Sequence, residues 1–138
     1  MTIQWTKRHF QETITQPLAQ ADKGSAFFEN NIVRLLLGLS GAVFLAVVGI
    51  LVIFIHPSEV LTVLHYNVYF GVDLLGAWWQ VYILPGVALV FVALNTVLAY
   101  YLYTKKQERI AAYLFLLGSL MLMSGVVLGC IAIAYINY

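Results

Sequence analysis

The chain has 138 residues, of which 62% are hydrophobic and only 9% are charged. Soluble domains are nearer half apolar and a quarter charged, and small ones leave much of their surface in water, so the composition excludes a water-soluble globule and favours the lipid bilayer as solvent. A formal net charge of +1 gives no electrostatic support for a nucleic-acid partner.

Residues 1–31 form an N-terminal arm that holds most of the polar side chains. Ile3, Phe10 and Ile14 recur at helical spacing before Pro17, which is typical of a short helix lying on the inner leaflet of a membrane. A loosely ordered cytoplasmic tail is the other interpretation. The pattern leaves both open.

Three apolar stretches follow, at residues 35–55, 79–103 and 110–136. The first, at about 1.5 Å per residue, spans about 30 Å, which matches the hydrocarbon core of a bilayer. The short charged turn at 104–109 makes the second and third stretches antiparallel neighbours. We therefore predict an all-α integral membrane protein with a three-helix membrane domain at 32–138.

The segment 56–78 is too long for a tight turn and should fold on the outer membrane surface. We expect a short helix over 57–64, then an extended piece over 65–70 that ends at Gly71. Aromatic residues, which collect at membrane interfaces, stand at both ends of the second span. They are Trp78, Trp79, Tyr82, Tyr100, Tyr101 and Tyr103.

The cations set the orientation. Every one lies in the arm, at its junction with the first span, or in the turn after the second span, whereas the outer loop and the C-terminus have none. The positive-inside rule then places the N-terminus in the cytoplasm and the C-terminus outside, with these side chains at the phosphates of the inner face. They are Lys7, Arg8, Lys23, Arg34, Lys105, Lys106 and Arg109.

No charged residue or histidine lies in the middle of any span, which argues against a proton relay, an ion pathway or a voltage sensor. Asn95 is the one strongly polar side chain at depth. Because a bare amide in lipid costs a few kcal/mol, we expect it to bond to another helix, with substrate contact as the alternative.

Small residues recur on one face of the first and third spans, which lets another helix approach closely. In one interpretation the two rows pack against each other within the chain. In the other they form a groove for a partner helix or for a second copy. The rows are Gly38, Ala42, Ala46 and Gly49 in the first span, and Gly118, Gly125, Gly129 and Ala132 in the third.

The outer loop is rich in turn formers. Asn67, Gly71 and Asp73 can hold it together locally, and His65 and Asp73 can form a buried structural pair. A metal site is a weaker alternative, because its candidate ligands lack a close spacing. Those ligands are His56, Glu59, His65 and Asp73. Cys130 is the only cysteine, so we expect no disulfide, metal cluster or cofactor.

This loop resembles the motif of the small bacterial membrane domain found in SdpI-type immunity proteins, over residues of about 40–100. The motif places a histidine, an asparagine and an aspartate between two helices, with glycines among them and an early proline in the second helix. Gly71 is displaced by one position, and the proline pair that normally precedes the histidine is missing. The matching residues are His65, Asn67, Asp73, Gly76 and Pro85. The resemblance implies a bacterial inner membrane and an envelope-facing recognition or immunity role.

We therefore expect a non-catalytic membrane subunit that docks into a larger membrane complex. Its contacts would be the glycine-rich helix faces and an aromatic outer loop that includes Tyr69, Phe70, Trp78 and Trp79. Its partners would be lipid and either other membrane subunits or further copies of itself. A standalone envelope protein of immunity or signalling type is the alternative that the resemblance supports.

Overall fold

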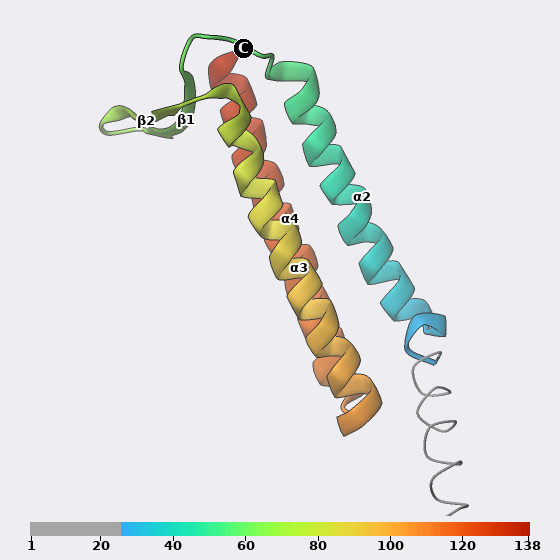
Figure 1. Cartoon of the computed structure of the whole chain (residues 1–138). Coiled ribbons are helices and arrows are strands. Elements are labelled where there is room, and N and C mark those ends of the chain that lie inside the picture. The colour runs from blue at the N-terminus through green and yellow to red at the C-terminus, as the bar shows by residue number, and fades with distance from the viewer. Residues whose placement is uncertain (1–25) are drawn as a thin grey trace, which may run out of the picture.

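A computed structural model describes residues 26–138, and the interfacial helix considered for the arm lies outside these residues. The described part of the chain contains three long helices: α2 (Asn31–Phe54), α3 (Ile83–Tyr101) and α4 (Arg109–Asn137) (Figure 1). Each is long and apolar enough to cross a membrane. The three predicted spans are confirmed as helices, with ends that differ by a few residues.

A 3₁₀ turn (Trp78–Tyr82) precedes α3, and a π-helical turn (Leu102–Lys106) follows it. The helical backbone therefore runs through much of the segment that we predicted as a turn. The chain reverses at Gln107, whose φ of 59° is left-handed, and Glu108 leads directly into α4. Pro85 lies in the first turn of α3, where its missing N–H removes no helix hydrogen bond.

The prediction of an all-α fold is incomplete, because residues 62–76 form a two-stranded antiparallel sheet. Strands β1 (Thr62–Asn67) and β2 (Gly71–Gly76) make a hairpin between α2 and α3. The helix expected over 57–64 is wrong, since its last three residues begin β1. Thr62 and Val63 are β-branched, which favours a pleated strand over a one-turn helix.

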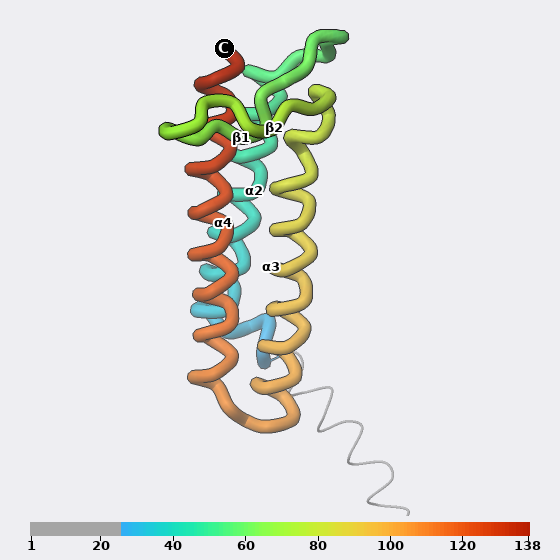
Figure 2. Tube along the Cα trace, turned by 90° about the vertical axis from the view of Figure 1, so that its left-hand side faces the viewer, coloured from blue at the N-terminus to red at the C-terminus, as the bar shows by residue number. Residues whose placement is uncertain are grey.

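Helix α4 is the centre of the bundle. It packs along its length against α2 and α3, whereas α2 and α3 touch at few points (Figure 2). The buried side chains follow the heptad-like steps of left-handed helix pairs. They are Val33, Ser40, Val47 and Leu51 in α2; Pro85, Ala88 and Ala99 in α3; and Ala112, Leu116, Ser119, Met123, Cys130 and Ala134 in α4.

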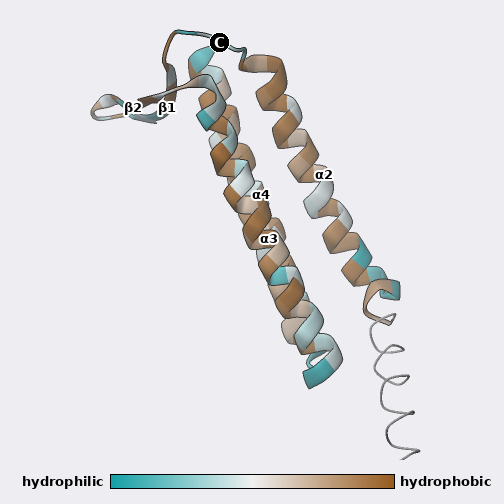
Figure 3. Ribbon diagram, in the orientation of Figure 1, coloured by the Kyte–Doolittle hydropathy of each residue, from teal (hydrophilic) through white to brown (hydrophobic). Residues whose placement is uncertain are grey.

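The two ends of the bundle differ in charge. Arg34, Lys105, Lys106 and Arg109 all lie at one end, here called the basic end. The hairpin lies at the opposite end, here called the hairpin end, as Figure 1 shows. Apolar residues dominate the helices between the two ends (Figure 3). This separation of cations is the arrangement that the sequence predicted for a chain with three spans.

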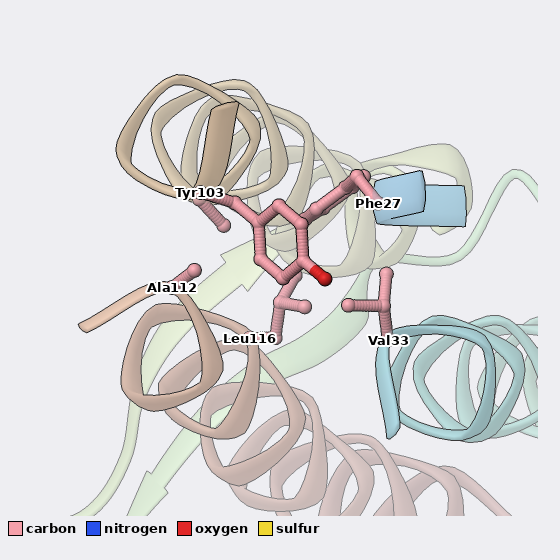
Figure 4. Packing of buried hydrophobic residues seen from close by; sticks show 6 residues of the cluster. Phe27, Val33, Tyr103, Ala112 and Leu116 are labelled. Carbon is pink, nitrogen blue, oxygen red and sulfur yellow. The ribbon is translucent and has the colours of Figure 1, made fainter. Parts of the chain in front are cut away.

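Phe27 closes the bundle at the basic end. Its side chain is fully buried, and its ring packs edge-to-face on Tyr103 with the centroids 5.3 Å apart. Figure 4 shows the Tyr103 ring between Phe27, Val33 of α2 and Leu116 of α4, which belong to one buried cluster. The segment before α2 is therefore anchored between all three helices.

Asn30 ties the same three elements together through hydrogen bonds. Its Oδ1 accepts the N–H groups of Ile32 and Val33 and so caps α2, at 2.9 and 3.4 Å. Its Nδ2 donates to the hydroxyls of Tyr113 at 2.9 Å and Tyr103 at 3.4 Å. One side chain thus starts α2 and joins it to α4 and to the turn after α3.

The prediction that Asn95 bonds to another helix is confirmed. Its Nδ2 donates to Ser119 Oγ of α4 at 3.1 Å, and Ser119 in turn donates to the Phe115 carbonyl at 3.0 Å. Hydrogen bonds of this kind between membrane helices contribute about 0.6 kcal/mol on average. Asn95 therefore joins α3 to α4 as a structural contact.

Candidate functional site: the outer hairpin and the open helix faces

The hairpin turn is built by the turn formers that the sequence singled out. Asn67 Oδ1 accepts the N–H of Tyr69 at 2.9 Å, which closes a local turn over residues 68–70. Gly71 then takes a φ of 78°, a conformation that a side chain would strain. Both residues thus have a structural reason for their place.

His65 and Asp73 face each other across the two strands. Nδ1 of the histidine lies 2.7 Å from Oδ1 of the carboxylate, which can only accept, so the imidazole donates. The pair itself is confirmed, but the expected burial is wrong, because the side chains are 62% and 42% exposed. An exposed pair of this kind links the strands with a contribution of about 1 kcal/mol or less.

Asn137, the last residue of α4, fastens the hairpin to the bundle. Its Oδ1 accepts the Val63 N–H, and its Nδ2 donates to the Val63 carbonyl, both at 2.8 Å. The same Nδ2 also donates to Ile133 O at 2.8 Å. The amide side chain thus bonds to the edge of β1 as a neighbouring strand would, which fixes the height of the hairpin on α4.

Gly76 ends β2 at a crowded point. A Cβ placed there would stand 2.0 Å from Gln80 Oε1 and 2.5 Å from Leu64 Cδ1, much closer than any real contact. Gln80 Oε1 already accepts the Ala77 N–H at 2.8 Å, which shapes the junction between the hairpin and α3. The glycine therefore permits the close approach of β2 to the first turn of the next helix.

The Gly76→Val variant should loosen this junction, because the new side chain displaces Gln80 from the Ala77 N–H. We expect a destabilisation of about 1–3 kcal/mol, as overpacking and a lost hydrogen bond combine. Amide exchange of residues 72–77 measures it. Gly71→Asn is the matched control, since asparagine tolerates a positive φ and nothing lies within 4 Å of its Cβ position among the described residues. Equal exchange in both variants would contradict this role of Gly76.

The hairpin exposes an apolar surface. Its tip residues Val68, Tyr69 and Phe70 are 83%, 90% and 84% exposed, and Tyr66, Val72, Leu74 and Leu75 are also exposed. Trp79 is half exposed at the base of the hairpin, and Trp78 packs against the buried cluster of Val47, Leu51 and Val81. Of the predicted loop contacts, Tyr69 and Phe70 are thus exposed to their surroundings, whereas Trp78 is partly buried against the bundle.

The rows of small residues lie on open helix faces. Apart from chain neighbours and the backbone of its own helix, no heavy atom of the described residues lies within 4 Å of the Cβ position at Gly38, Gly49, Gly118 or Gly125. Gly129 is the exception, with Leu84 Cδ2 at 3.5 Å. The interpretation that the two rows pack against each other is therefore wrong.

The physical reason is helix periodicity. In α2, Gly38 and Ala42 stand about half a turn away from the face of Val33, Ser40 and Val47 that packs on α4. Within the chain, the contact with α4 is made by larger side chains at heptad positions. Ala42 and Ala46 are therefore left exposed on the opposite face of α2.

The cations that the structure describes are exposed at the basic end, and Arg109 also lies over the Tyr103 ring, 5.5 Å from its centroid. Lys7, Arg8 and Lys23 lie outside the described residues. Within residues 26–138 no three histidine, cysteine or acidic side chains gather in a way that could hold an ion. Of the four candidate ligands in the outer loop, His65 and Asp73 lie in contact with each other.

Comparisons with known proteins add no relative. Scans against models of protein families, against curated proteins and against solved structures find no match to this chain.

Sequence reasoning missed two asparagines whose hydrogen bonds hold the structure together at the two ends of the bundle. Asn30 stands directly before the first apolar run, which is a helix-cap signal, whereas the partner of Asn137 lies 74 positions away and leaves no local signal.

Proposed function

We propose that this protein is a non-catalytic membrane subunit that docks into a larger membrane complex through the small-residue faces of its helices, with the outer hairpin as a further contact. It sits in the membrane with its basic end in the cytoplasm, as the distribution of cations favours. The observation that carries the proposal is the open row on α2, where Gly38, Ala42 and Ala46 face away from the bundle.

A row of small side chains favours helix association only when the backbone of another helix packs against it. Helix association in lipid depends on close van der Waals packing, which small side chains permit. Against lipid alone, glycine lowers helix stability by about 1 kcal/mol relative to alanine and gains no contact in return. Because α2 uses a different face within the chain, a helix from outside is the occupant that fits the row.

The Gly38→Leu variant tests the docking. In membranes of the cells that make the protein, mild detergent should release the natural chain in a complex much larger than its 15.4 kDa. Leucine at position 38 should shift most of it to a single-chain species, because it blocks close approach without touching the fold. Gly41→Leu is the matched control, since Gly41 is equally open but lies about a quarter turn from the row. A natural chain that runs alone, or two variants that behave alike, would contradict the proposal.

A standalone envelope immunity or signalling protein is the second candidate. Its support is that His65, Asn67 and Asp73, three of the residues that carry the resemblance to the SdpI-type domain, lie in one exposed hairpin at the end away from the cations. Deleting the gene and challenging the cells with secreted toxins tests this role. Unchanged sensitivity to every envelope stress would argue against it.

A further inference from the structure

The apolar hairpin tip has a definite depth on the bundle. Helix α4 has 29 residues and is therefore about 43 Å long, against a hydrocarbon core of about 30 Å. A helix of this length, centred in the bilayer, extends about 6–7 Å beyond the core at each end. Asn137 and the bonded Val63 then stand in the headgroup layer.

After Val63 the hairpin projects sideways from the bundle and also turns back toward the basic end. A cavity of about 280 Å³ lies between β1 and α4, with His65 and Tyr66 on one side and Gly129, Ala132 and Ile133 of α4 on the other. Residues 129–133 stand about 6–12 Å below the end of α4. The hairpin, which projects away from the helices in Figure 1, thus lies level with the edge of the hydrocarbon core.

The chemistry of the hairpin suits that depth. Residues 60–76 contain no lysine or arginine, and the carboxylate of Asp73 is paired with His65. The exposed rings of Tyr66, Tyr69 and Trp79 are amphipathic and favour the boundary between headgroups and acyl chains. A lone two-stranded hairpin is marginal in water, so a surface that covers its apolar side chains also stabilises it.

We infer that the hairpin is a lipid-binding element, seated in the boundary between headgroups and acyl chains with the side chains of Val68, Tyr69 and Phe70 in the leaflet. The occupant of this surface is the membrane, because lipid surrounds the bundle at that depth on every side that no protein covers. The inference changes one part of the proposed function. If the hairpin is seated in lipid, the contacts with protein partners are made by the helix faces alone.

Spin-label accessibility tests the inference. The full chain is labelled at Tyr69→Cys and, as a water-exposed control in the preceding loop, at Glu59→Cys, then reconstituted alone in vesicles of phosphatidylcholine and phosphatidylglycerol. Cys130 stays in place because it is fully buried, and the unsubstituted chain gives the background. Collisions with oxygen should exceed those with a water-soluble nickel chelate at position 69, and the order should reverse at position 59.

Two results would overturn the inference. A label at position 69 that collides mainly with the nickel chelate places the tip in water. One that is shielded from both reagents places it against protein, which in these vesicles is this chain itself or another copy of it. Because the vesicles hold no other protein, the result does not depend on whether α2 docks onto a partner in the cell.

Discussion

Replacing Asn137 by alanine is expected to release the hairpin from α4. The substitution removes three hydrogen bonds at once and leaves the N–H and carbonyl groups of Val63 without their partner. At about 1 kcal/mol for each bond, we expect a loss of about 2–3 kcal/mol in the stability of the hairpin. Amide exchange at Val63 should then become roughly 30- to 150-fold faster, since 1.4 kcal/mol is about a factor of ten.

The Asn137→Asp variant distinguishes the hydrogen bond that the side chain accepts from the two that it donates. The carboxylate keeps an acceptor for the Val63 N–H but loses the donor to the Val63 and Ile133 carbonyls, so exchange should rise to an intermediate value. The helices should remain folded in both variants, because the buried clusters lie below this residue. Val63 exchange that stays at the natural rate in Asn137→Ala would show that the hairpin is held by other contacts.

Replacing Asn30 by alanine is expected to destabilise the whole bundle. The variant loses the cap of α2, worth about 1 kcal/mol, together with the two hydrogen bonds to the tyrosine hydroxyls. Tyr103, which packs on Phe27, also loses its link to α2. We expect a total loss of about 2–3 kcal/mol, measured as a lower midpoint of unfolding in sodium dodecyl sulfate.

Two further variants distinguish the effect of the helix cap from that of the hydrogen bonds to the tyrosine hydroxyls. Asn30→Asp keeps the capping oxygen and loses only the donor to the tyrosines, so it should recover about 1 kcal/mol of the loss. Asn31→Ala is the matched control, because the neighbouring amide is exposed, and its effect should stay within about 0.5 kcal/mol. Similar losses in Asn30→Ala and Asn31→Ala would mean that the contacts of Asn30 add nothing to stability.

The helices could be predicted from the sequence because their cause is local. Each long apolar run carries its own requirement that the backbone bond within the segment, so composition and length were sufficient. The pairing of the helices was less accessible. The sequence indicated that Asn95 bonds to another helix but not that its partner is Ser119. The glycine rows predicted close packing between helices within the chain, whereas the helices pack through heptad positions on other faces.

The hairpin was predicted only in part: the extended piece expected over 65–70 overlaps β1, whereas the second strand was missed. Each of its signals is weak. The register of β1 shifts between Val63 and Tyr66, so no clean alternation marks the strand. The turn carries three apolar residues instead of a polar pair. The flanking pattern could have revealed it: Asn67 closes a turn, and Gly71, four positions later, supplies the left-handed residue directly after the three-residue loop. The contact with Asn137 joins residues 74 positions apart in the sequence and leaves no trace in a local pattern.

The open face of α2 is the basis of the docking account, and photo-crosslinking from Leu35 tests it most directly. Leu35 is an exposed large residue on the same helix face as Gly38 and Ala42, so a photoreactive phenylalanine at this position does not fill the small-residue row. It is activated in membranes of the cells that make the protein, with the outward-facing Val90 of α3 as the control. The account predicts a discrete protein adduct at position 35, diminished by the additional Gly38→Leu substitution. Adducts with lipid alone at both positions would contradict it.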